Sequence, residues 1–295
     1  LAGTINYTGN VTVTDNAYTI AELVAINAGT TGEIALTSAG VALSGSVADI
    51  KLAFAGTVTE HTGTLEITDA NTTDITATDI TDINGTNTGT ITVANAIDIN
   101  GSGSEVKAAF DAIDTNTGNA TANITGTDYT VAQLKAINNK TTGAIVLATS
   151  TSEALSGDGT DLAAALAGTI NYTGNVTVTD NAYTIAELVA INAGTTGEIA
   201  LTSAGVALSG TVADIKSAFA GTVTEHTGTL EISDANTVDI TATDITDING
   251  TNTGTITVAN AIDINGSGSE VKAAFDAIDT NTGNATANIT GTDYT

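Results

Sequence analysis

The stretch that decides the fold is "YTIAELVAIN", residues 18–27, because the chain uses it more than once. It returns unchanged at residues 183–192, and it returns in altered form as "YTVAQLKAIN" at residues 129–138. The unchanged copy lies 165 residues further on, and residues 1–130 match residues 166–295 at all but four positions. A repeat of this fidelity predicts one structural unit that is stacked on copies of itself, as in solenoid proteins.

A finer repeat divides each 165-residue period into three. Leu1, Phe54, Phe110 and Leu166 fall at equivalent places, which gives steps of 53, 56 and 56 residues. We therefore expect one full period at 1–165, with units at about 1–52, 53–108 and 109–165, and a second, incomplete period at 166–295. The chain begins and ends inside this pattern, so we expect one continuous solenoid that is a segment of a longer array.

Short apolar stretches that alternate with period two follow glycines throughout the chain. Examples are "GNVTVT" at residue 9, "GEIALT" at residue 32 and "GTLEIT" at residue 63. Such alternation predicts short strands with one buried face. Short and long steps alternate between these strands, so the predicted building block is a pair of them, about 55 residues in length.

A helix-start signature follows each strand, in which Ser, Thr or Asp precedes an acidic residue or Gln by three positions. The side chain of the first residue can accept a hydrogen bond from a free amide of the first helical turn. The six predicted N-caps of the first period are Thr19, Ser46, Thr76, Ser102, Thr130 and Asp158. The helices that follow span about two turns, so they must dock on neighbours to be stable.

These signals together predict an α/β solenoid of stacked short parallel strands and short capped helices. The alternative is a β-solenoid that contains only helical turns. Large apolar residues at equivalent places of successive blocks should be buried on one another. The predicted core stack consists of Leu1, Phe54, Phe110, Leu166, Phe219 and Phe275.

The composition is strongly acidic, with 33 Asp and Glu against 6 Lys and Arg and a net charge of −27. Nucleic acids require a basic surface, so we expect no nucleic-acid partner. No apolar stretch is long enough to cross a bilayer, so we expect no membrane insertion. The predicted partner is the protein itself, through end-to-end or lateral association.

Residues capable of chemistry are few. The two histidines, His61 and His226, are expected in surface loops, and no catalytic nucleophile motif is present. Carboxylates at Asp69, Asp74 and Asp82 are weak candidates for calcium ligands, although no standard calcium loop surrounds them. The sequence therefore predicts no catalytic residue and no required cofactor, with Ca²⁺ as the one ion that remains a candidate.

The repeats "YTIAELVAINAGTTG" and "LSGSVADIKLAFAG" resemble those of very large, acidic, Thr- and Asp-rich surface proteins of cyanobacteria and marine bacteria. The resemblance implies an extracellular or cell-surface location and a role in adhesion or in sheath or fibre formation. We expect a structural protein without catalytic activity, a segment of a long extracellular filament, stalk or surface-layer fibre. The alternatives are the stalk of a large adhesin, with or without calcium-stabilised repeats, and, more remotely, an enzyme on a β-helix scaffold.

Overall fold

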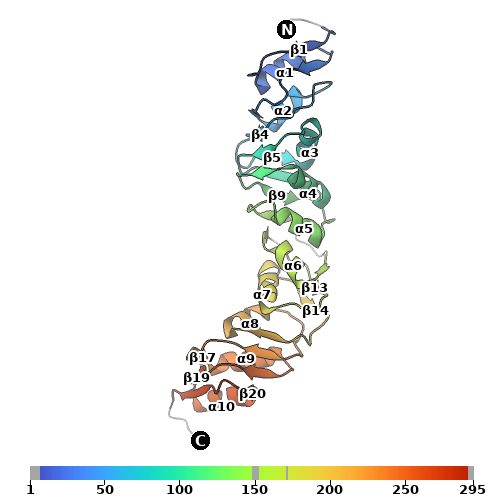
Figure 1. The fold of residues 1–295 in the computed structure, drawn as a ribbon. Helices are drawn as coiled ribbons and strands as arrows, with labels where there is room; N and C mark the ends of the chain where they lie inside the picture. The colour runs from blue at the N-terminus through green and yellow to red at the C-terminus, as the bar shows by residue number, and fades with distance from the viewer. Residues whose placement is uncertain (1–6, 148–152, 171, 292–295) are drawn as a thin grey trace. The chain divides into compact units, whose positions relative to one another are not determined.

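The computed structural model describes residues 7–147, 153–170 and 172–291, which form an α/β fold (Figure 1). In this part of the chain, ten α-helices alternate with short strands, all strand pairs are parallel and no sheet closes into a barrel. The prediction of short parallel strands with short helices is therefore confirmed. Internal contacts divide the chain into two units: unit 1 comprises Leu1–Thr149 and Gly168–Ile170, and unit 2 comprises Ser150–Ala167 and Asn171–Thr295.

The described residues of unit 1 form five helices and three sheets. The helices are α1 (Ile20–Gly29), α2 (Val47–Ala53), α3 (Ala77–Thr86), α4 (Gly103–Ala112) and α5 (Val131–Asn138). The strands are β1 (Val11–Val13), β2 (Ile34–Leu36), β3 (Leu43–Gly45), β4 (Leu65–Ile67), β5 (Asp74–Thr76), β6 (Ile91–Val93), β7 (Asp98–Gly101), β8 (Thr115–Asn116), β9 (Thr121–Ile124), β10 (Ile145–Leu147) and β12 (Thr169–Ile170). Their orders are β1-β2, β3-β4-β6-β8 and β12-β10-β9-β7-β5.

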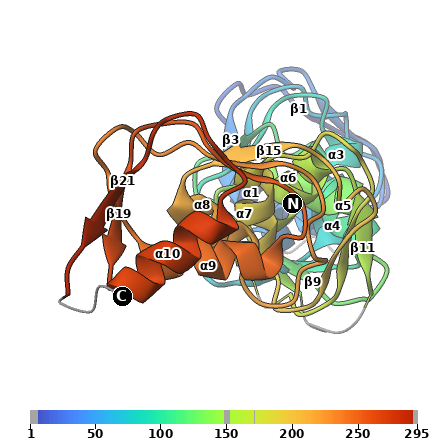
Figure 2. The ribbon, with the colours of Figure 1, turned by 90° about the horizontal axis from the view of Figure 1, so that it is seen from below.

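Unit 2 repeats most of this arrangement. Its helices are α6 (Gly159–Leu166), α7 (Ile185–Gly194), α8 (Val212–Ala218), α9 (Ala242–Thr251) and α10 (Gly268–Ala277). Its strands are β11 (Leu155–Gly157), β13 (Val176–Val178), β14 (Ile199–Leu201), β15 (Leu208–Gly210), β16 (Leu230–Ile232), β17 (Asp239–Thr241), β18 (Ile256–Val258), β19 (Asp263–Gly266), β20 (Thr280–Asn281) and β21 (Thr286–Ile289). Their orders are β11-β13-β14, β15-β16-β18-β20 and β17-β19-β21. Figure 2 shows α10 packed beside α9 and β21 beside β19.

Within a sheet, each strand pairs with a strand from the previous or the next coil of the chain, and we call each such coil a layer. Val11 of β1 pairs with Ile34 of β2, and Leu65 of β4 pairs with Ile91 of β6. Strands joined by a short step are therefore neighbours, as the sequence repeat indicates. Strands joined by a long step are not, because Leu65 pairs with Leu43 and not with Ile34. The extra strand β3 occupies the long step and starts a new sheet.

The glycine before each strand allows two turns of backbone to approach closely. A β-carbon on Gly89 would lie 2.0 Å from the carbonyl oxygen of Gly63, and one on Gly32 would lie 2.4 Å from that of Gly9. No side chain fits at such distances, so glycine is required here. The same close approach to the preceding turn of backbone occurs at Gly63, Gly118 and Gly143, so glycine before these strands is a packing requirement.

Contacts between successive layers hold the short helices. In α1, the Thr19 hydroxyl accepts a hydrogen bond from the Glu22 amide at 3.3 Å, and the Glu22 carboxylate accepts one from the Thr19 amide at 2.9 Å. At the other end, Asn27 Nδ2 donates to the carbonyl oxygens of Leu52 and Ala55, at 2.7 and 2.8 Å. The last turn of α1 thereby caps the C-terminal end of α2, and Asn192 of α7 caps the end of α8 in the same way.

The predicted core stack is buried at four of its described positions. Phe54 and Phe219 are each 6% exposed, Phe110 is 1% exposed and Leu166 is 2% exposed. Phe275 is half-buried, which departs from the prediction, and Leu1 lies outside the described residues. Phe110 and Phe275 occupy the same place in identical helices, so the difference must come from what packs around them.

Candidate functional site

All six predicted caps stand at the N-terminus of a helix. In each case the side chain accepts a hydrogen bond from the backbone amide three residues further on. These positions are Thr19, Ser46, Thr76, Ser102, Thr130 and Asp158. Three of the helices, which start after Thr19, Ser102 and Thr130, have the complete reciprocal capping box. Each of these side chains begins a helix, so the role of the caps is structural.

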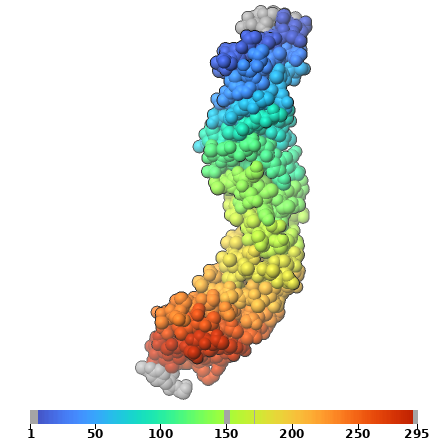
Figure 3. Space-filling model, in the orientation of Figure 1, coloured from blue at the N-terminus to red at the C-terminus, as the bar shows by residue number. Residues whose placement is uncertain are grey.

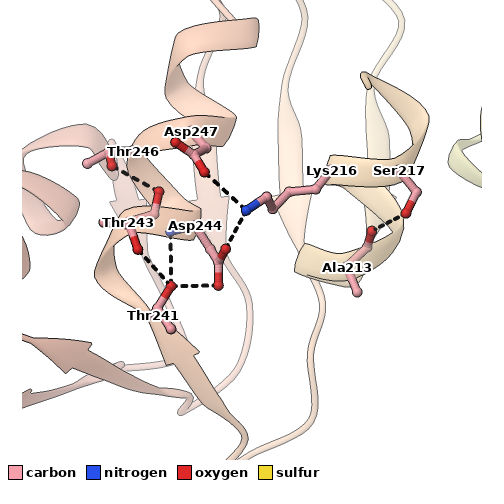
Figure 4. Close-up of polar contacts among 8 residues, drawn as sticks. All are labelled: Ala213, Lys216, Ser217, Thr241, Thr243, Asp244, Thr246 and Asp247. Atoms are coloured by element: carbon pink, nitrogen blue, oxygen red, sulfur yellow. Dashed lines mark hydrogen bonds and ion pairs between the residues drawn. The ribbon is translucent and has the colours of Figure 1, made fainter. Parts of the chain in front are cut away.

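One polar cluster joins the consecutive helices α8 and α9 (Figure 4). Lys216 of α8 reaches across to α9, where its Nζ donates to Asp244 at 2.5 Å and to Asp247 at 3.0 Å. The hydroxyl of Thr241, the N-cap of α9, donates to the Asp244 carboxylate at 2.7 Å and accepts from the Asp244 amide at 3.2 Å. The equivalent residues in unit 1 are Lys51, Asp79, Asp82 and Thr76. We call each set a lysine bridge.

The lysine bridge shifts the acid–base properties of its members. Hydrogen bonds to Asp79 and Asp82 raise the pKa of Lys51 above its ordinary value. Burial alone would raise the pKa of Asp79, but the hydrogen bonds from Lys51 and Thr76 outweigh burial, so this pKa lies below its ordinary value. Both shifts favour the charged forms, which suit an ion pair and oppose proton transfer at neutral pH.

The three calcium candidates serve three different contacts. Asp69 accepts a hydrogen bond from the Val47 amide at the start of α2, at 2.8 Å. Asp74 accepts one from Asn100 at 3.1 Å, and Asp82 belongs to the lysine bridge. Among the described residues, no group of three or more His, Cys, Asp or Glu side chains is placed to hold a metal ion. The structure thus does not gather Asp69, Asp74 and Asp82 into one site.

The expectation that the histidines lie in surface loops is wrong. His61 is fully buried, with its Nε2 2.7 Å from the Val41 carbonyl oxygen and its Nδ1 2.9 Å from Asn87 Oδ1. Its ring also contacts Phe54, at 5.7 Å between centroids, and His226 repeats this environment in unit 2. The three polar groups come from three successive layers, so the imidazole ties the layers together. Sequence reasoning missed this because the partners lie 20 and 26 residues away.

An open groove of about 680 Å³ lies beside α3 and α4. Its lining consists of Thr81, Asn84, Asn87, Thr88, Gly89, Ala108, Asp111, Ala112 and Asp114. The Asp111 carboxylate is paired with Lys107 at 2.5 Å, and that of Asp114 accepts a hydrogen bond from the Ile91 amide at 2.9 Å. Both carboxylates are thus already engaged in contacts within the protein, and the groove presents no paired acid and base.

Two further findings bear on function. Among the described residues, every helix is too short or too polar to span a bilayer. Comparison of the chain with protein-family models, with curated proteins and with solved structures gives no match. The contacts within the molecule are therefore the observations that bear on its function.

Proposed function

We propose that this chain is a structural protein: a segment of a long extracellular filament, stalk or surface-layer fibre, built as an α/β solenoid and without catalytic activity. The observation that carries the proposal is that its polar clusters recur with the same geometry. The lysine bridge of Lys51 recurs at Lys216, and the buried imidazole of His61 recurs at His226. A chain normally has one catalytic site, whereas a contact that holds layers together adds stability each time it is repeated.

The repeated contacts also suit a fibre because each joins one layer to the next. Asn27 of α1 caps α2, Lys51 of α2 pairs with α3, and His61 binds groups before and after it in the chain. Stability of this kind comes from nearest neighbours and does not fall as layers are added. The acidic surface and the resemblance of the repeats support an extracellular or cell-surface location.

Electron microscopy of the purified 295-residue chain tests the proposal. We expect thin unbranched filaments whose length increases with protein concentration. Dispersed monomers at every concentration in sedimentation velocity would contradict it, and a filament with a globular head would favour the adhesin stalk.

A further inference from the structure

The two histidines are buried titratable groups that belong neither to the helix caps nor to the lysine bridges. His61 and His226 are each 0% exposed, and each ring contacts the same set of groups within its own unit. Figure 3 shows the surface that covers these layers, light blue around residue 61 and orange around residue 226. Because a buried polar atom needs a partner, the hydrogen bonds of each ring determine which of its nitrogens carry protons.

One ring nitrogen faces an oxygen that can only accept a hydrogen bond. Nε2 of His61 lies 2.7 Å from the Val41 carbonyl oxygen, and Nε2 of His226 lies 2.7 Å from that of Val206. A backbone carbonyl oxygen has lone pairs and no proton, so the ring must be the donor at this position. Nε2 therefore carries a proton in both units.

The other ring nitrogen faces an asparagine whose amide orientation is fixed by separate contacts. Asn87 Nδ2 donates to the Gly89 carbonyl oxygen at 2.9 Å, and Asn87 Oδ1 accepts from the Gly89 amide at 3.2 Å. A half-turn of the side-chain amide would place oxygen against oxygen and N–H against N–H, so its hydrogen-bond network assigns the orientation. The atom that lies 2.9 Å from His61 Nδ1 is therefore the amide oxygen, which can only accept. The same contacts recur in unit 2.

A ring with an acceptor at each nitrogen needs a proton on each, and that form of histidine is the charged imidazolium. A neutral ring would leave one nitrogen lone pair directed at an oxygen lone pair, inside the protein and away from water. Hydrogen bonds from a charged donor are stronger than neutral ones, and the Phe54 ring lies 5.7 Å from the His61 ring between centroids. The net charge of −27 also favours a positive group anywhere in the chain.

Charged side chains near the His61 ring are engaged elsewhere. Glu60 on the same segment is exposed, and the segments that carry the two hydrogen-bond partners, residues 39–42 and 86–89, contain no titratable residue. Of the charged residues of α2 and α3, Asp49 bonds to the cap Ser46, and the other three form the lysine bridge. Within the described residues, the ring forms no ion pair, so its charge depends on the two oxygen partners.

We propose that His61 and His226 make the stability of the layers sensitive to protons. In the folded chain each ring holds a proton on both nitrogens and joins its two oxygen partners, and this contact is lost when a ring gives up one proton. We call each ring with its two partners a histidine bridge. All of its groups lie within one unit, so the inference does not depend on filament formation.

The direction of the pH effect follows from proton binding. An unfolded histidine loses its second proton as pH rises through about 6.5, whereas the folded ring keeps it because both nitrogens face acceptors. The folded chain then binds more protons than the unfolded chain, so this stabilisation is complete below about pH 6.5 and is lost at higher pH. Each histidine changes the folding equilibrium constant by at most about tenfold per pH unit. A ring that is neutral in the fold would give the opposite sign.

Solid-state nuclear magnetic resonance of the full chain, labelled with ¹⁵N in histidine and sedimented in hydrated form, tests the protonation directly. At pH 7.5 we expect a directly bonded proton at both nitrogens of both rings. The matched control is the same chain unfolded in urea at pH 7.5, in which most rings should have one nitrogen without a proton. A folded chain whose rings carry only one proton each at this pH would overturn the inference.

Urea denaturation between pH 6 and pH 8.5 tests the consequence for stability. Histidine is the only side chain of this chain that ordinarily titrates in that range, since Cys is absent. We expect the free energy of unfolding to fall as pH rises. A free energy of unfolding that rises with pH would contradict the inference.

A pair of double variants assigns the effect to the histidine bridges. Asn87→Ala with Asn252→Ala removes the acceptor at Nδ1, so the rings no longer need a second proton and the fall in stability with pH should disappear. The matched control, Asn84→Ala with Asn249→Ala, changes exposed asparagines and should keep the fall. An equal pH dependence in both double variants would overturn the inference. The resonance experiment uses the unaltered chain, so it decides the question even where a variant does not fold.

Discussion

The paired residues Phe110 and Phe275 provide a test of the layer packing inside one chain. Each is the eighth residue of a helix with the sequence "GSEVKAAFDA", but Phe110 is 1% exposed and Phe275 is half-buried. Replacement of a fully buried Phe by Ala costs about 3–5 kcal/mol, because transfer free energy is lost and a cavity remains. At Phe275 less area is lost and solvent can enter, so we expect Phe275→Ala to cost about 1–2 kcal/mol.

Urea denaturation followed by far-ultraviolet circular dichroism measures both variants. The curves should be fitted with separate transitions for the two units, since a single two-state fit is not justified for a chain of two compact units. Leu52→Ala, at an exposed position of α2, is the control and should change the free energy of unfolding by less than about 0.5 kcal/mol. Equal costs at Phe110 and Phe275 would refute the argument, since they would mean that α5 adds nothing to the burial of Phe110.

Three further predictions follow from the polar contacts. Asn87→Ala should destabilise unit 1 by about 1–3 kcal/mol, because it removes a hydrogen-bond partner of the buried His61 ring. The control, Asn84→Ala at an exposed position, should have little effect in the same urea experiment. Because the pKa of Asp79 is lowered, its ion pair with Lys51 stabilises the fold above about pH 3.8, and this contribution is lost as pH falls through the lowered pKa. The melting temperature of Lys51→Met should therefore fall less on acidification than that of the unaltered chain. An equal fall in both proteins would contradict this prediction. Because the chain has a net charge of −27, its melting temperature should rise as sodium chloride is added. Calcium chloride at matched ionic strength should raise the melting temperature further only if specific calcium sites exist. A melting temperature that changes with neither salt would contradict the electrostatic argument.

The sequence by itself determined those features whose partners lie close together in the chain. A cap such as Thr19 and its partner Glu22 are three residues apart, so the pattern of residue types is sufficient to locate the start of a helix. Strands such as β2 and β4 were predicted from alternation alone, because the side chains of a strand point to opposite faces in turn. The glycine marker was also visible in the sequence, although its cause, the close approach of two layers, was not.

The tertiary structure alone decided which segments meet. Ile34 and Leu65 carry the same strand signal, yet they belong to different sheets, since β3 intervenes and its "LSG" sequence has the composition of a turn. His61 was assigned to the surface because its hydrogen-bond partners lie one layer before and one layer after it. The weak calcium candidates Asp69 and Asp82 are 13 residues apart in the sequence, and one contacts the start of α2 while the other contacts a lysine farther along that helix.

Phe275 shows the limit of local reasoning most directly. Its helix is identical in sequence to that of Phe110, so no property of the segment itself can distinguish the two residues. Burial is a relation between a side chain and the layer that packs on it, and α5 covers α4 in unit 1 while no described element covers α10 in the same way. The local sequence pattern therefore determines which residues form the helices and strands of a layer, and contact with the next layer determines which side chains are buried.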